Sequence, residues 1–190
     1  MGYSHVLPSK RLDRTPTLLQ ISQHEILQAM PTDFPSTLEF RPAIDADGAG
    51  ISAVIERIFG DYENCPFIAD EFPELRAPAT HYAKKGGQLW TLEEKQPDQT
   101  RVIVGSIAVA ATYREGVFEL FKFYLAHHLR GQEIARLMLE QAFGFARDAG
   151  AGSMELWTDT RFKSGHRFYE KHGFVRIPGM RALHDSGDTL

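Results

Sequence analysis

The sequence predicts one α/β domain built on a mixed, mostly antiparallel central sheet with helices on both of its faces. Two observations predict this class. Residues 88–126 contain three strand-like apolar segments joined by short polar turns, a pattern typical of adjacent antiparallel strands. Residues 117–160 then hold a strand, an amphipathic helix and a second strand, and a crossover of this length places its flanking strands parallel or splayed apart. The 190 residues, 43% of them hydrophobic, suffice for one domain with a real core.

The composition excludes several classes of protein. The 21 lysines and arginines against 25 acidic residues give a net charge of −4, so no global attraction to nucleic acid or to an anionic membrane is expected. No apolar run approaches the roughly 20 residues that cross a bilayer. The single cysteine, Cys65, cannot form an internal disulfide, and residues 1–14 lack the apolar core of a secretory signal. We therefore expect a cytoplasmic protein.

Residues 1–37 are predicted to form an N-terminal appendage, and the domain proper is predicted to span residues 38–190. The appendage is polar and punctuated by prolines. With Thr15 and Pro16 in cap and first-turn positions, it carries one weak helical pattern, formed by Leu19, Gln23, Ile26, Leu27 and Met30. We expect an arm that packs on the domain or on a partner subunit, and we assign it no chemistry.

The domain opens with a strand and a helix. Residues 38–43 predict the strand, and the helix after it places apolar side chains on one stripe, formed by Ile51, Val54, Ile55, Ile58 and Phe59. Residues 61–78 contain three prolines and three large aromatic residues, which predicts an irregular loop of the kind that often lines a site. The elements expected next are a short helix at 80–85, hairpin strands at 88–94 and 101–113, and a strand at 117–126.

The last part of the chain predicts two helices that alternate with two strands. The elements expected there are a helix at 130–149, a strand at 153–160, a helix at 163–172 and a strand at 174–177. Gly150 ends the first helix. Gly173 suits the left-handed position after the second helix, so that Phe174 re-enters the core.

The junction at residues 125–135 is the first feature with chemistry of its own. A strand ends there and a helix begins, and the first turn of a helix presents unpaired N–H groups and the positive end of the helix dipole. Gly131 lets a ligand approach the backbone closely, and Arg130 adds a positive charge. These features indicate a site for an anion such as phosphate.

Tyr169, on the last helix, is the second such feature. A phenol can give a proton to a leaving group without carrying a charge beforehand, which suits a general acid. A metal site is not expected, because His127 and His128 are adjacent in a turn and no Cys or further His lies at ligand spacing.

Together with the order of elements, the segments RGQEIA at 130–135 and FYEKHGF at 168–174 resemble the GCN5-related N-acetyltransferase (GNAT) family over residues 38–177. The family pattern is Arg or Gln, two residues, Gly, one residue, and then Gly or Ala. The resemblance implies a sheet with a splayed parallel pair, acetyl-CoA as co-substrate, and a loop that holds its pyrophosphate. The residues of that loop are Arg130, Gly131, Gln132, Glu133, Ile134 and Ala135.

The resemblance also implies where the rest of the co-substrate lies. The pantetheine arm is expected to pair with the backbone of Phe123, Tyr124 and Leu125 like an added strand, and an amide of that strand is the expected oxyanion donor. Two positions depart from the family pattern. Glu133 stands where the family usually has glycine, and Phe162 stands where it often has asparagine.

The implied reaction is transfer of acetyl from acetyl-CoA to a primary amine by direct attack in a ternary complex. Tyr169 is the expected acid for the leaving thiolate. Glu119 is the expected base, acting through water, because it lies on the same alternating face as Phe121 and Phe123. His166, one helical turn before Tyr169, is a second candidate base.

The acceptor pocket is expected between the first helix, the loop at 61–78 and the last strands. Tyr62, Phe67 and Phe72 would form its apolar walls, while acids of the same loop, Asp70, Glu71 and Glu74, would attract a cation. A small-molecule amine is favoured over a protein chain as the acceptor. Two other hypotheses remain: a non-catalytic acyl-CoA-binding or regulatory module, motivated by Glu133 and Phe162, and an interaction protein without CoA affinity.

The family normally closes with another strand, yet the segment ALHDSGDTL at 182–190 is polar. We therefore expect either a truncated sheet or a strand supplied by a partner, and we predict a homodimer.

Overall fold

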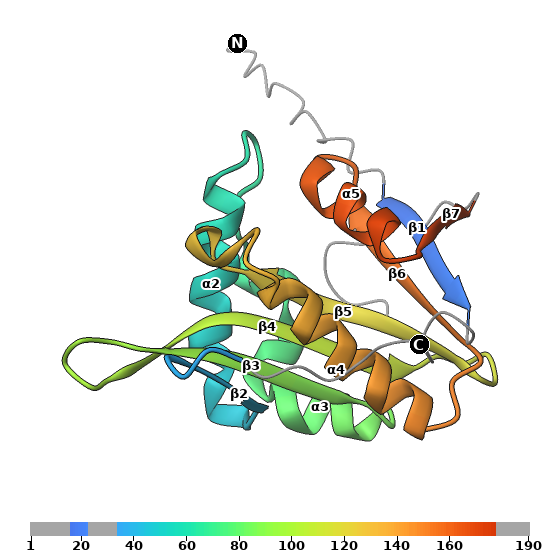
Figure 1. Cartoon of the computed structure of the whole chain (residues 1–190), viewed down its shortest axis with the longest axis horizontal. Helices are drawn as coiled ribbons and strands as arrows, with labels where there is room; N and C mark the ends of the chain where they lie inside the picture. Colours follow the sequence, from blue (N-terminus) through green and yellow to red (C-terminus); the bar gives the residue numbers. More distant parts are fainter. Residues whose placement is uncertain (1–15, 23–33, 178–190) are drawn as a thin grey trace, which may run out of the picture.

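The computed structural model describes residues 16–22 and 34–177. Within this part of the chain, one seven-stranded sheet has the strand order β2-β3-β4-β5-β6-β1-β7 (Figure 1). The strands are β1 (Pro16–Ser22), β2 (Leu38–Pro42), β3 (Gln88–Lys95), β4 (Arg101–Ala111), β5 (Val117–Leu125), β6 (Ser153–Asp159) and β7 (Val175–Ile177). The α-helices are α2 (Gly48–Gly60), α3 (Pro78–Lys84), α4 (Ile134–Asp148) and α5 (Lys163–Lys171).

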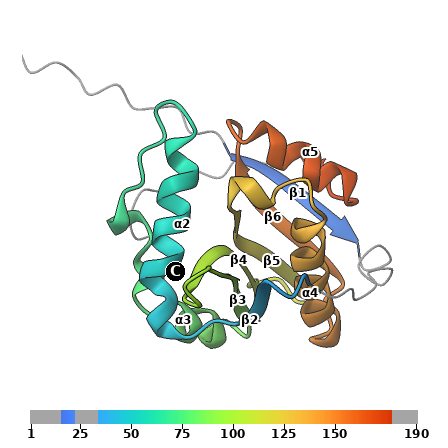
Figure 2. The same ribbon diagram turned by 60° about the vertical axis from the view of Figure 1, so that its left-hand side comes forward.

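Helices cover both faces of the sheet, with α2 and α3 on one face and α4 and α5 on the other (Figure 2). Each face has its own core because side chains alternate along a strand. On β4, Ala108 and Ala110 pack with the α2 and α3 side chains, whereas Ile107 and Val109 pack with those of α4. The predicted α/β class, with a mixed sheet between helices, is confirmed.

The parallel pair β5 and β6 is joined over only its first half. Its pairing runs from Val117 opposite Ser153 to Leu120 opposite Leu156. Beyond these residues β5 continues to Leu125, and no strand within residues 16–22 and 34–177 pairs with its β6 side, while β4 still pairs with its other edge. The two strands therefore separate, as the predicted splay requires, and leave an open edge on β5.

A β-bulge interrupts β5 inside this open stretch. Phe121 lies opposite Ala108 and Tyr124 opposite Ser106, so one β4 residue faces two residues of β5. Lys122, in the bulge, has a φ of +49°. The extra residue reverses the alternation of side chains that follow it.

The bulge corrects one prediction about the faces of β5. Phe121 packs against Tyr82 of α3, whereas Phe123 packs against Tyr169 of α5 on the other side of the sheet. Glu119 precedes Phe121 by two residues and shares its face. The prediction that Glu119, Phe121 and Phe123 share one face is therefore wrong for Phe123.

Strand β1 lies between β6 and β7 and is antiparallel to both. Leu19 and Ile21 are buried while Leu18 and Gln20 are partly exposed, which is the two-residue period of a strand. The helix predicted from Leu19 onward is wrong here, because two neighbouring strands supply hydrogen-bond partners that a weak helical pattern cannot match. The rest of that pattern, at 23–30, lies outside the described residues.

The segment at 182–190, on which the missing closing strand was predicted, lies outside the described residues. Among the described residues, the sheet takes the strand between β6 and β7 from the N-terminal part of the same chain. The homodimer stays a prediction. The boundary between residues 37 and 38 also stays a prediction, although β1 joins the sheet of the domain that follows.

Candidate active site

The loop before α4 has the backbone of an anion site. Gly131 has a φ of +77° and Glu133, which caps the helix, has a φ of +65°. Both lie in the left-handed region, where a residue with a Cβ is strained by about 1 kcal/mol. The family's glycine thus corresponds to a position whose backbone favours glycine. The first N–H groups of α4 have no partner within the helix and point out of its N-terminus.

The Glu133 carboxylate is paired with a cation of the same helix. Its Oε2 accepts a hydrogen bond from Nε of Arg136 at 2.5 Å, and the side chain is 66% exposed. This hydrogen bond lowers the pKa of Glu133, so the carboxylate stays ionised and paired with Arg136. Arg136 therefore offsets the negative charge that this departure from the family pattern brings to the loop.

Two side chains of the loop donate to backbone carbonyls that precede it. Nε of Arg130 donates to the carbonyl of Leu125 at 3.1 Å, and the amide of Gln132 donates to the carbonyl of His128 at 2.6 Å. Ile134 is buried in the core beneath α4, so only its backbone can contact a ligand. Residues 130–135 thus form the connection into α4 and its first turn.

Phe123, Tyr124 and Leu125 form the open edge of β5. Their side chains fill the two cores on either side of the sheet, since Phe123 packs against Tyr169 and Tyr124 packs against Phe59 of α2. In the described part of the chain, no strand pairs with their backbone on the β6 side. An extended ligand can pair there as an additional strand, which is the arrangement predicted for the pantetheine arm.

Tyr169 lies on α5 at the side of this gap. Its ring contacts Phe123 at 6.1 Å and Phe174 at 5.7 Å between centroids. Burial raises the pKa of the Tyr169 phenol, so it stays protonated at neutral pH and can act as an acid. Gly173, with a φ of +88°, ends the helix and returns buried Phe174 to the core, as predicted.

Glu119 is buried in the hydrogen-bonded part of the sheet, on the face of α2 and α3. It lies in register with Ala110 on one side and Glu155 on the other, and Glu155 is ion-paired with Arg114. Tyr169 is on the opposite face of the sheet. The structure therefore does not bring the two predicted catalytic residues side by side, because Glu119 lies on the face of α2 and α3.

The aromatic residues of the 61–78 loop gather as predicted. Phe67 stacks on Phe72 at 5.1 Å, and both contact Phe59. Tyr62 contacts Phe162 at 4.7 Å. The phenylalanine that replaces the family's asparagine thus belongs to an apolar wall beside Phe59 and Tyr62.

The acidic residues of this loop differ from the prediction. Asp70 pairs with Arg76 at the surface. Glu74 is ion-paired with Lys122 of the β5 bulge, and Nζ of Lys122 lies 4.5 Å from the centre of the Phe72 ring. Sequence reasoning missed Lys122, because no glycine or proline in β5 indicated a bulge.

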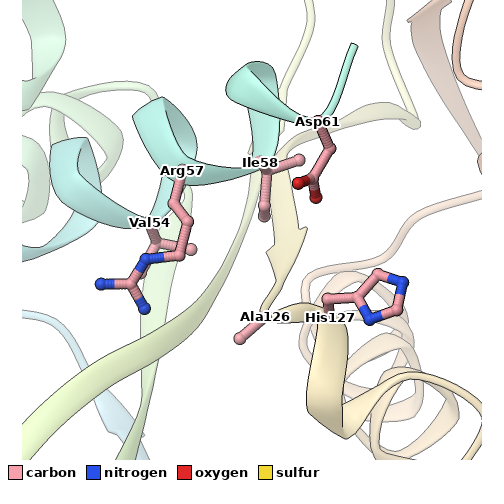
Figure 3. Close-up of a pocket in the computed structure, with 6 residues that line it drawn as sticks. All are labelled: Val54, Arg57, Ile58, Asp61, Ala126 and His127. Carbon is pink, nitrogen blue, oxygen red and sulfur yellow. The ribbon is translucent and has the colours of Figure 1, made fainter.

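A small cavity of about 90 Å³ opens between α2 and the connection from β5 to α4 (Figure 3). It is lined by Val54, Arg57, Ile58, Asp61, Ala126 and His127. Asp61 comes from the end of α2 and His127 from the opposite side, so a carboxylate and an imidazole both border the cavity. The sequence predicts Val54 and Ile58 on the apolar stripe of the first helix and His127 in a turn, and it does not single out Arg57 or Asp61.

Within residues 16–22 and 34–177, no group of three or more His, Cys, Asp or Glu side chains could hold a metal ion. His128 instead lies 3.2 Å from the carboxylate of Glu94. No helix in these ranges has the length and apolar character that crossing a membrane requires.

The splayed parallel pair, the loop at the N-terminus of α4 and the buried tyrosine beside the gap define the fold class of the acetyltransferases. The chain belongs to the acetyltransferase (GNAT) family, whose profile matches residues 55–174. The resemblance carried by residues 130–135 and 168–174 is thereby confirmed.

Solved structures share this fold. A GNAT-family acetyltransferase from Staphylococcus aureus Mu50 has a TM-score of 0.67 at 20% identity, covering 80% of this chain and 92% of its own. An acetyltransferase from Streptococcus agalactiae 2603 has a TM-score of 0.67 at 22% identity, and the match covers 82% of this chain and 92% of the other. A GNAT-family acetyltransferase from Streptococcus pneumoniae has a TM-score of 0.55 at 20% identity, and the match covers 73% of this chain and 84% of the other. No curated protein is significantly similar in sequence.

Proposed function

We propose that this protein transfers acetyl from acetyl-CoA to the primary amine of a small molecule, by direct attack in a ternary complex. The open edge of β5 at Phe123, Tyr124 and Leu125 carries the proposal. One end of this edge leads into the anion loop of α4, and Tyr169 lies beside it. An extended thioester with a phosphate group at its far end matches that arrangement.

The residues present fit acetyl-CoA in three ways. The backbone of Phe123 to Leu125 would pair with the pantetheine amides, and the first N–H groups of α4 would hold the pyrophosphate. Arg130 supplies a cation beside them. The Glu133 carboxylate is held by Arg136 on the exposed side of the loop, which removes the repulsion that its sequence position suggests.

The chemical roles follow from what amide formation requires. The amine nitrogen forms a bond to the acetyl carbon, the carbon–sulfur bond breaks, and a proton passes from the amine to a base. We assign that base to Glu119, acting through water from the α2 and α3 face. Tyr169 gives its proton to the leaving thiolate, and a backbone N–H of β5 donates to the oxyanion.

The acceptor would enter from the α2 and α3 face. The aromatic cluster around Phe67 and Phe72 supports an acceptor with an apolar part, and Glu74 already holds one primary ammonium, that of Lys122. A small amine suits this enclosed cluster better than an extended peptide. Composition supports a cytoplasmic location without nucleic acid or membrane partners, and we retain the homodimer as a proposal.

A non-catalytic acyl-CoA-binding module is the second candidate. The strained backbone of Glu133 and the apolar Phe162 favour it, because both replace residues that serve the co-substrate in the family. Such a module would bind acetyl-CoA and would not acetylate any amine.

Calorimetric titration with acetyl-CoA tests the binding part of the proposal. At about 100 times its dissociation constant, the ligand is expected to stabilise the fold by about 2.7 kcal/mol, which is visible as a rise in Tm. Arg130→Ala is expected to weaken binding. Arg147→Ala, at the other end of α4, is the matched control and is expected to leave it unchanged. Absence of binding by the native protein at millimolar acetyl-CoA would overturn the proposal.

A further inference from the structure

A second cavity, of about 360 Å³, lies between the first turns of α5 and the strand β7. The described residues that line it are Thr160, Lys163, His166, Arg167 and Arg176. Four of these five are basic and none is acidic. Within residues 16–22 and 34–177, neither Lys163 nor Arg167 pairs with a carboxylate, while Arg176 pairs with Glu170. The cavity is therefore a local cationic site in a chain whose net charge is negative.

This cavity is separate from the acetyl-CoA gap. Lys163 and Arg167 are four residues apart and share one side of α5. Phe162, Gly165 and Tyr169 share another side, where a Cβ on Gly165 would lie 3.7 Å from the Tyr169 ring. Tyr169 packs on β5, whereas Arg176 belongs to β7, beyond β6 and β1 in the sheet. The two sites thus lie on different sides of the same helix.

His166 gives the second observation. The residue is only 5% exposed, and its Nε2 lies 3.0 Å from the backbone carbonyl of Asp159. A carbonyl only accepts, so Nε2 carries the proton and donates it. Nδ1 is then a buried acceptor without a hydrogen-bond partner in the described structure. Because a buried polar atom left without a partner costs about 1–3 kcal/mol, a ligand that supplies one is favoured.

We propose that this cavity binds a phosphate group, either as inorganic phosphate or as a small phosphate monoester. Lys163, Arg167 and Arg176 neutralise its charge, and the Thr160 hydroxyl and the first N–H groups of the nine-residue helix α5 donate to its oxygens. Nδ1 of His166 accepts a hydrogen bond from a P–OH of the bound group. Sulfate carries no proton at neutral pH and would leave Nδ1 without a donor, so the site prefers phosphate. This inference does not depend on acetyl transfer.

The experiment uses Arg130→Ala as its background, because the α4 loop also attracts phosphate. Inorganic phosphate, sulfate and glycerol 3-phosphate are titrated separately in chloride buffer at constant ionic strength, with Tm and calorimetry as readouts. We expect a rise in Tm with phosphate that exceeds the rise with sulfate. Tighter binding of glycerol 3-phosphate than of phosphate identifies a monoester as the source, and the reverse identifies the free anion.

Variants then locate the binding. Lys163→Gln/Arg167→Gln is expected to weaken phosphate binding by about tenfold or more, since two cations are lost. Lys171→Gln, on the same helix but outside the cavity lining, is the control and keeps the native affinity. His166→Phe keeps the cations and is expected to abolish the preference for phosphate over sulfate. If His166→Phe does not fold, Lys163→Gln/Arg167→Gln alone tests whether phosphate binds in this cavity. Phosphate binding that survives the double variant, or no binding of phosphate or monoester up to about 20 mM, overturns the proposal.

Discussion

The carboxylate of Glu74 and the ammonium of Lys122 form an ion pair that is largely shielded from water, with side chains 12% and 16% exposed. The pair joins the loop between α2 and α3 to the bulge of β5. Lys122 holds a left-handed backbone there, and its ammonium also lies over the ring of Phe72. One contact therefore fixes both the acceptor-side loop and the strand that is proposed to bind the thioester.

Lys122→Met tests this contact. Removal of the ammonium leaves Glu74 as a poorly hydrated, unpaired charge, and the free energy of unfolding is expected to fall by roughly 2 kcal/mol. Urea denaturation measures the change. Arg76→Gln removes the partner of Asp70 in an exposed pair of the same loop and is expected to leave the stability unchanged. An equal change in the free energy of unfolding for the two variants would show that the pair of Lys122 with Glu74 contributes no more to stability than an exposed pair.

Glu133→Gly addresses the departure in the anion loop. Glycine adopts a φ of +65° without strain, so the variant is expected to be more stable by about 1 kcal/mol and to bind acetyl-CoA several-fold more tightly. Glu133→Gln is the matched comparison, because it removes the charge and keeps the Cβ. If the glutamine variant gains as much stability as the glycine variant, charge rather than backbone strain is responsible.

Tyr169→Phe separates chemistry from binding. The hydroxyl is proposed to protonate the thiolate, so kcat is expected to fall by roughly 100-fold while the Kd for acetyl-CoA stays the same. Steady-state kinetics and calorimetry on one preparation give both values. Tyr113→Phe, at an exposed tyrosine, should match the native enzyme. A native kcat in Tyr169→Phe would remove this tyrosine from the mechanism.

Unfolding at alkaline pH tests whether the phenols of Tyr124 and Tyr169 are buried. Burial raises the pKa of Tyr124 and of Tyr169 in the folded protein, so the folded state holds their protons more tightly than the unfolded state does. The contribution of these two phenols to stability is then constant below about pH 10, the ordinary tyrosine pKa, and is lost as the pH rises above it. Absorbance at 295 nm during alkaline unfolding should show these phenols ionising together with the loss of structure. Ionisation near pH 10 in the folded protein would contradict their burial.

Most elements could be predicted from local pattern. The stripe of Ile51, Ile55 and Phe59 gave a helix, and the order of strand, helix and strand after residue 117 gave the splayed pair. Residues 130–135 and Tyr169 could be proposed from the sequence because the chemistry expected of them depends on the start of one helix and on one face of another, and both features are local in sequence.

The features missed depend on partners distant in sequence. Leu19 and Ile21 fit a helix as well as a strand, and only pairing with β6 and β7 decides between the two. The bulge at Lys122 arises from the register between β4 and β5, and it alone determines that Phe123 and Glu119 face opposite sides. The pair of Glu74 with Lys122 joins residues 48 positions apart, beyond the reach of any periodicity.

A turnover assay tests most directly whether the protein transfers acetyl from acetyl-CoA to a small primary amine. The protein is incubated with acetyl-CoA and a panel of small primary amines, and both free CoA thiol and acetylated amine are quantified by mass spectrometry. We predict that at least one amine is acetylated in one-to-one proportion with CoA released, and that Tyr169→Phe slows both together. Acetyl-CoA binding that depends on Arg130, with no acetylated product from any amine, would contradict catalysis and indicate an acyl-CoA-binding module.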